Sequence, residues 1–94
     1  MEDQEKEQMI QNLYELFVQI GSVEDCRILL DDLCTNKEVE QMAQRLKAAQ
    51  LLKQGHTYTQ VIEMTDISSA TLSRVSRCLK YGKGYRKFVH GEQD

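Results

Sequence analysis

The chain has 94 residues, with 12 basic and 15 acidic side chains. A chain of this length forms one small domain, which buries a modest share of its surface, so a partner subunit would help to stabilise it. It contains no proline and many helix-forming residues, and this composition favours an all-α fold over a sheet. No apolar run approaches the roughly 20 residues that cross a bilayer, and the polar start excludes a signal peptide, so we expect a cytoplasmic protein without membrane contact.

Three helices are expected in the first part of the chain. Residues 1–8 are polar and are predicted to form a flexible acidic arm. Apolar residues recur at spacings of three and four from Met9 to Ile20, which predicts a first helix. Ser22 would cap a second, and a third, longer helix would end at Gly55. The inward residues of the third helix are expected to be Val39, Met42, Leu46, Ala49 and Leu52 or residues near them.

Two short helices and a tight turn are predicted after Gly55. Thr57 and Gln60 have the spacing of a capping box and would begin the first of them, which reaches about Met64. Residues 65–67 form the turn, and Ser68 caps the second helix. This outline is typical of a helix-turn-helix.

The charges are divided unevenly along the chain. Residues 1–44 carry 11 acidic and 3 basic side chains, whereas residues 45–94 carry 9 basic and 4 acidic ones. From Ile67 to His90 there are six basic residues and no acidic one. Such asymmetry indicates a polyanionic partner, although a solvated basic face would have the same composition.

The helix after Ser68 has two different faces. At 100° per residue, Leu72, Val75, Cys78 and Leu79 fall within a sector of about 120°, so this side is expected to pack. The other side lacks the acids that an ordinary surface helix pairs with lysine. Its residues are Ser69, Ala70, Ser73, Arg74, Ser76, Arg77, Lys80 and Tyr81.

The free side has the properties of a recognition helix. Small residues at its start would let the backbone approach the floor of a major groove, and helix N-terminal amides and basic side chains suit phosphates. We assign contacts with DNA bases to Ser69, Ala70 and Ser73. We assign contacts with DNA phosphates to Ser68, Arg74, Arg77 and Lys80.

The segment RLKAAQLLKQGHTYTQVIEMTDISSATLSRVSRCLKYG resembles the helix-turn-helix core of the bacterial Trp repressor, and more closely that of the Trp-repressor-like YerC/YecD group. The resemblance covers about residues 33–82, and SSATLSRVSRCLKYG is its most specific part. It implies an intertwined homodimer that acts as a transcriptional repressor on double-stranded DNA. Its operator would be palindromic, with half-sites about 34 Å apart. The expected regions are a helical dimerisation region (9–54), the helix-turn-helix (55–82) and a basic, partly disordered C-terminal tail with one more helical turn (83–94).

Three residues depart from the family pattern. The family often has basic residues where this chain has Thr59 and Ile62, and helix-turn-helix proteins usually have a turn glycine at the position of Asp66. Aspartate tolerates the left-handed conformation, so the turn is expected to survive. The departures leave an alternative open, in which a degenerate helix-turn-helix serves as a protein–protein interaction module for an acidic partner.

The resemblance also implies an effector pocket, to which Thr35, Arg45 and Arg74 correspond. Val75 stands where the repressor has a glycine that admits the indole ring, and Cys78 stands where a serine would meet the amino group. These two residues argue against tryptophan. A different small-molecule effector, or none, is the expectation, and no other cofactor is predicted.

Neither catalysis nor metal binding is expected. His56 and His90 lie apart and have no cysteine, serine or carboxylate partner at a motif spacing. Cys26, Cys34 and Cys78 lack the close pairs of zinc and redox sites, which predicts reduced thiols. We therefore assign no catalytic residue and no metal ligand.

Overall fold

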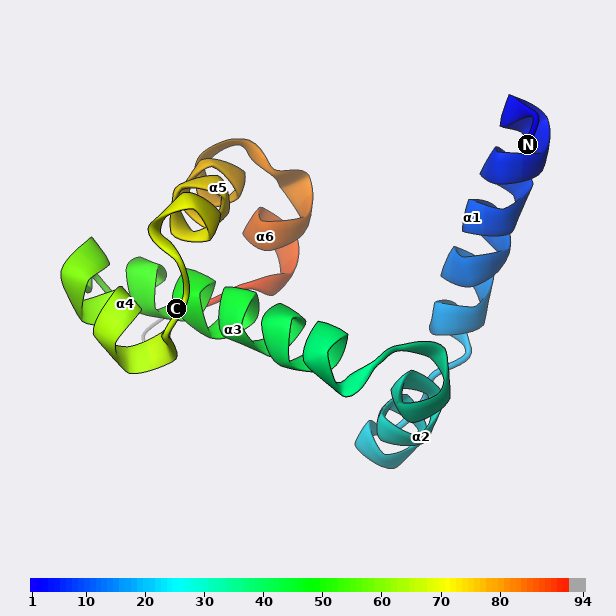
Figure 1. Cartoon of the computed structure of the whole chain (residues 1–94), viewed down its shortest axis with the longest axis horizontal. Coiled ribbons are helices and arrows are strands. Elements are labelled where there is room, and N and C mark those ends of the chain that lie inside the picture. Colours follow the sequence, from blue (N-terminus) through cyan, green and yellow to red (C-terminus); the bar gives the residue numbers. More distant parts are fainter. Residues whose placement is uncertain (92–94) are drawn as a thin grey trace. The chain divides into compact units, whose positions relative to one another are not determined.

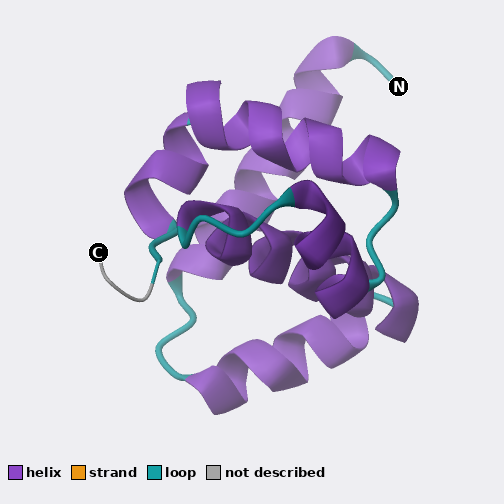
Figure 2. Cartoon of the chain, turned by 90° about the vertical axis from the view of Figure 1, so that its left-hand side faces the viewer, coloured by secondary structure: helices purple, strands orange, loops and turns teal. Residues whose placement is uncertain are grey.

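The computed structural model describes residues 1–91, and every regular element in this range is a helix (Figures 1 and 2). The all-α prediction is therefore confirmed. The chain divides into two units, with residues 1–35 in the first and the rest, from Asn36, in the second. The helices are α1 (Asp3–Val18), α2 (Val23–Leu33), α3 (Asn36–Lys53), α4 (Tyr58–Thr65), α5 (Ser69–Tyr81) and α6 (Lys83–Phe88).

The first unit consists of α1 and α2. Helix α1 begins at Asp3, earlier than the expected start at Met9, and so includes most of the segment predicted to be a flexible arm. Glutamate, glutamine and lysine in this segment are good helix formers, and Asp3 and Glu5 in the first turn complement the helix dipole. Helix α2 begins as predicted, because the Ser22 hydroxyl accepts the N–H of Asp25 at 3.0 Å.

Neither helix of the first unit contains a buried residue. The apolar stripe of α1 is open to solvent, with Met9 51% and Phe17 43% exposed. A shallow groove of about 360 Å³ runs along the two helices, and apolar side chains from both of them line it. Burial of apolar surface is the main favourable contribution to folding, so these helices gain little of it within one chain.

The second unit has a core to which α3, α4 and α5 contribute. Helix α3 packs against α4 and α5, and α6 packs against α5 (Figure 1). The expected burial of Met42 and Leu46 is wrong, because these side chains are 39% and 45% exposed. The buried part of α3 lies in its C-terminal half, where two alanines allow close packing of the neighbouring helices. The buried residues are Ala48, Ala49, Leu51, Val61, Ile67, Leu72, Val75 and Val89.

The connection from α3 to α4 follows the sequence signals. Gly55 has a φ of 95°, a left-handed conformation that glycine adopts without steric cost. The Thr57 hydroxyl accepts the N–H of Gln60 at 3.2 Å, and the Gln60 side-chain oxygen accepts the N–H of Thr57 at 2.9 Å. The predicted capping box is thus confirmed.

The turn between α4 and α5 is also formed as expected. Asp66 has a φ of 60° and a ψ of 17°, so aspartate takes the left-handed position where glycine is usual. The Thr65 hydroxyl donates to the Val61 carbonyl at 2.7 Å and accepts the N–H of Ile67 at 3.3 Å. The Gln44 side chain of α3 donates to the Thr65 carbonyl at 3.2 Å and holds the turn against α3.

The end of α5 requires a glycine for a steric reason. Gly82 has a φ of −82°, which any residue can adopt. However, a Cβ added there would lie 2.6 Å from the Cys78 carbonyl oxygen. This close approach lets the chain leave α5 and enter α6, which is the extra helical turn predicted from the sequence. Part of the expected disordered tail, residues 92–94, lies outside the described residues.

We predict that Gly82→Ala lowers the free energy of unfolding by about 1–3 kcal/mol, because the added methyl group forces backbone atoms apart. The measurement is the urea midpoint followed by circular dichroism. Gly84→Ala is the matched control, since its added Cβ would meet no heavy atom from outside its own stretch of helix within 4 Å. It should be neutral, or stabilising by up to about 1 kcal/mol through helix propensity. Equal midpoints for the two variants would contradict the steric role of Gly82.

Candidate nucleic-acid interface

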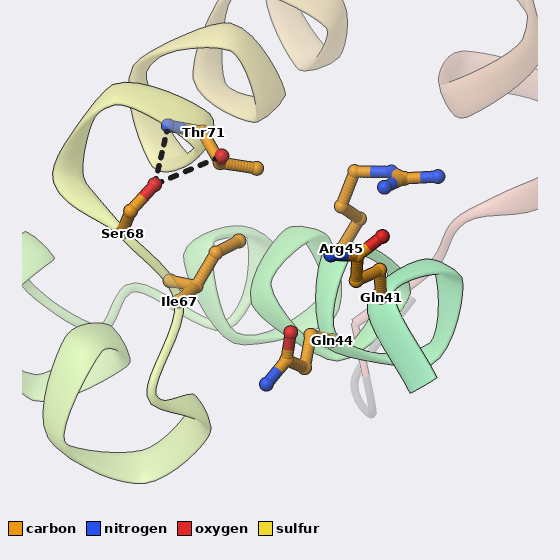
Figure 3. A pocket seen from close by; sticks show the side chains of 6 residues that line it. All are labelled: Gln41, Gln44, Arg45, Ile67, Ser68 and Thr71. Carbon is orange, nitrogen blue, oxygen red and sulfur yellow. Dashed lines mark hydrogen bonds between the residues drawn. The ribbon is translucent and has the colours of Figure 1, made fainter. Parts of the chain in front are cut away.

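The start of α5 is held by a serine cap. The Ser68 hydroxyl accepts the N–H of Thr71 at 3.1 Å and donates to the Thr71 hydroxyl at 2.9 Å (Figure 3). The proton of Ser68 is therefore engaged, and a phosphate contact through this hydroxyl would have to replace its bond to Thr71. The N–H groups of Ser69 and Ala70 lie in the first turn, where a helix supplies no acceptor, so they are available to an external anion.

Helix α5 has one packed and one free side, as its sequence pattern predicts. Leu72 and Val75 are 0% and 1% exposed, and Cys78 and Leu79 are half-buried. Ser76 is also half-buried, although its position in the sequence predicts that it lies on the free side. The exposed residues are Ser69, Ala70, Ser73, Arg74, Arg77, Lys80 and Tyr81.

Small and basic side chains occupy different parts of the free side. Ser69, Ala70 and Ser73 lie in its first turns, and the short side chains leave the backbone accessible there. Arg77 and Lys80 follow towards the C-terminal end. The structure therefore places the expected base contacts next to one another, with Ser68 before them and the basic residues expected to contact phosphates after them.

The basic residues of α5 are not neutralised. Arg74, Arg77 and Lys80 form no ion pair with another residue in the range 1–91. Arg27 of α2 is different, because its guanidinium binds Glu24 and lies 3.1 Å from Asp31, and the hydrogen bond to Glu24 raises the pKa of Arg27. The free side of α5 thus presents uncompensated positive charge.

Helix α4 presents fewer groups than α5 that could bind a polyanion. Thr59 is exposed, whereas Ile62 is partly buried and packs against the core. Ile62 therefore serves packing, and α4 contains no basic residue. Side-chain cations of the motif come from α5 alone.

Two of the expected effector residues lie at one cavity. Arg45 of α3 and Arg74 of α5 both line a hollow of about 300 Å³. Thr35 belongs to the first unit and is not among the residues that line it. Val75 and Cys78 contribute to the wall of this cavity. Val75 is larger than the glycine of the repressor, and Cys78 is less polar than its serine. The other lining residues, which the sequence did not indicate, are Gly82, Gly84 and Tyr85.

A second cavity, of about 320 Å³, lies at the start of α5. Arg45 lines it as well, so this arginine borders both cavities. The sequence pattern assigns no role to Gln41 and Gln44, although their spacing with Arg45 places all three along one side of α3. Ile67, Ser68 and Thr71, from the turn and the first part of α5, complete the lining, and in Figure 3 the Arg45 guanidinium points away from Ser68 and Thr71.

The remaining candidate groups have structural surroundings. The ring nitrogen Nδ1 of His56 lies 3.2 Å from the Leu51 carbonyl oxygen at the end of α3, which is the position of a helix-capping group. Cys26, Cys34 and Cys78 are free thiols. Within residues 1–91 no three histidine, cysteine or acidic side chains are arranged to hold a metal ion. No helix in the described part of the chain combines the length and apolarity needed to cross a bilayer.

The chain is similar to several known proteins. It is 41% identical over 73 residues to the uncharacterized protein YerC of Bacillus subtilis, and the match covers 78% of this chain and 70% of YerC. A crystal structure of a candidate Trp repressor from Staphylococcus aureus matches with a TM-score of 0.81 and 32% identity, over 95% of this chain and 91% of that one. A TrpR-like protein from Eubacterium eligens matches with a TM-score of 0.80 and 32% identity, over 85% of this chain and 84% of that one. The sequence profile of the Trp repressor protein matches residues 8–93, so the chain belongs to the Trp repressor protein family.

Proposed function

We propose that the protein is a sequence-specific DNA-binding regulator of transcription in the cytoplasm, with α5 as its recognition helix. One observation carries this proposal: the free side of α5 combines short side chains in its first turns with basic side chains that no described acid neutralises. Short side chains allow close approach to base edges, and unpaired cations attract phosphates. Membership of the Trp repressor protein family supports the same function.

The proposed contacts divide into two kinds. Ser69, Ala70 and Ser73 would contact base edges in the major groove. The free N–H groups at the start of α5 would bind a phosphate, and Ser68 would contribute through its place in this turn. Arg74, Arg77 and Lys80 would bind phosphates along the backbone and fix the orientation of the helix.

The regulator would act as a homodimer. The apolar stripe of α1 between Met9 and Phe17 is exposed in the single chain, and a second copy would bury it. Two recognition helices related by a two-fold axis would fit half-sites about 34 Å apart in a palindromic operator, where occupancy would repress transcription. Sedimentation analysis tests the assembly, and a stable, folded monomer at micromolar concentration would exclude it.

The cavity between Arg45 and Arg74 would bind the effector of this regulator. Two guanidinium groups favour a small molecule with an anionic group, and about 300 Å³ is at the lower end of the range for ligand pockets. Val75 occupies the position that would have to admit the indole ring of tryptophan, and Cys78 the position that would have to bind the α-amino group of the amino acid. An effector smaller than tryptophan, with a carboxylate or phosphate, therefore fits the cavity better.

A second candidate function is a helical module that binds an acidic protein. The observation in its favour is α4, which contains no basic residue and uses Ile62 for packing. Both functions predict binding that weakens with salt. They differ in specificity, because a regulator prefers its operator over bulk DNA by about 10³-fold or more, whereas a protein-binding module shows no such ratio.

Selection of bound duplexes from a random DNA pool tests the proposal. Purified protein is incubated with the pool and competitor DNA at near-physiological salt, and the retained duplexes are sequenced. We expect a palindrome to be enriched. A pool that stays unenriched, both alone and with tryptophan or a metabolite extract added, would favour the protein-binding module. Enrichment only with the extract would identify an effector other than tryptophan.

A further inference from the structure

Helix α6 is fixed to the second unit by its inner side. Tyr85 is partly buried against the core, and Val89, four residues later, is 4% exposed. The Arg86 guanidinium donates to the Lys80 carbonyl at 2.7 Å and so attaches α6 to the end of α5. The basic segment after Gly82 is therefore an ordered part of the domain surface over residues 83–89.

The outer side of α6 carries two lysines. Lys83 and Lys87 are each two residues from Tyr85 in the sequence. Two residues correspond to a rotation of about 200° around the helix, so both lysines lie opposite the buried side. They are four residues apart and are neighbours on the helix surface, with about 5–6 Å between Cβ atoms. Both are exposed, and neither forms an ion pair within residues 1–91.

The beginning of α6 lies beside Arg74, on the free side of α5. Arg74 and Gly84 line the same cavity, which places the beginning of α6 beside the recognition helix. Lys83 directly precedes Gly84, and Lys80 at the end of α5 is bonded through its carbonyl to Arg86. No acidic residue interrupts the sequence between Ile67 and His90. The run of basic residues thus extends from α5 into α6 without an acid.

We propose that α6 is a second DNA-contacting element, in which Lys83 and Lys87 bind backbone phosphates beyond the half-site that α5 contacts. This inference rests on the proposed DNA binding and extends it to a surface outside the helix-turn-helix. Lysine acts as a point charge towards phosphate, so these contacts raise affinity without reading sequence. The ammonium group of Lys87 lies 5.4 Å from the centroid of the exposed Phe88 ring, which is a cation–π contact at the surface.

The test compares the unaltered protein with the Lys83→Ala/Lys87→Ala double variant on the selected operator. The slope of log K against log salt should become shallower by about 0.9 for each phosphate that the variant no longer neutralises. Affinities for operator and bulk DNA should fall by the same factor, so that their ratio is unchanged. Hydroxyl-radical footprinting should show that the outermost deoxyribose positions of the backbone lose their protection while the inner ones keep it.

The matched control is Lys37→Ala/Lys47→Ala, which removes the same charge from exposed positions on α3. It should retain the wild-type slope and footprint. If the salt slope and the footprint changed equally in both double variants, the loss of net charge would explain the effect, and the role of α6 would be overturned. An unchanged footprint and slope in the α6 variant would overturn it as well, with the operator binding of the wild type intact. If the wild type itself enriches no DNA, the proposed function fails, and this inference fails with it.

Discussion

A Leu72→Ala variant is expected to lose about 2–5 kcal/mol of unfolding free energy. Leu72 is 0% exposed and is one of the largest fully buried side chains, on the side of α5 that packs into the core. Its truncation removes apolar contacts and leaves a cavity that the surrounding helices fill only in part. Small domains have about 5–15 kcal/mol of stability, so this one change should remove a large share of it.

Urea denaturation of the whole protein, followed by circular dichroism, measures the change in unfolding free energy. Ser73→Ala, at the next residue, is the control, because Ser73 is exposed on the free side of the same helix. Its unfolding free energy should change by less than about 0.5 kcal/mol. Similar midpoints for the two variants would mean that α5 is oriented differently from the structure described above.

A Ser73→Gln variant is expected to prefer a different DNA sequence from the wild type. The longer side chain would project from the first turns of the free side, where a serine leaves room for the base edges. Affinity for the wild-type operator should fall by about 1–3 kcal/mol, while binding to bulk DNA changes little. Repeating the duplex selection with the variant would reveal the altered position within each half-site.

Lys80→Ala provides the contrast for this experiment. The substitution should weaken binding to all DNA sequences alike and make the salt slope shallower by about one, since a phosphate contact carries no sequence information. The two variants thus separate base contacts from phosphate contacts on one helix. A uniform loss of affinity in both would show that Ser73 does not contact bases.

The local features of the fold could be predicted because their signals lie within a few residues. The caps at Ser22, Thr57 and Ser68 each depend on a hydroxyl and an N–H three residues later, and all three are formed. The packed side of α5 follows from a regular period of apolar residues. The left-handed Asp66 was predictable from the small set of residues that tolerate this conformation.

The features that the sequence does not predict depend on contacts between distant segments. Periodicity identifies an apolar stripe on α3 but does not show where along it α4 and α5 pack, so the core positions predicted for Met42 and Leu46 are wrong. Val89 follows Phe88 in a basic tail, and the sequence does not show which of the two is buried, whereas in the structure Val89 is 4% and Phe88 73% exposed. The cavity that joins Arg45 to Tyr85 brings together residues 40 positions apart, which no local pattern indicates.

The absence of buried residues from α1 and α2 has a consequence for hydrogen exchange. Helices that gain little from burial open locally at low free-energy cost, so their amide protons should exchange with solvent water far faster than those of α5. Any partner that covers the apolar stripe of α1 would slow this exchange, and for a self-partner the slowing would grow with protein concentration. The amides of the first helix therefore serve as a built-in reporter of assembly, which deuterium exchange can follow along the helix without any mutation.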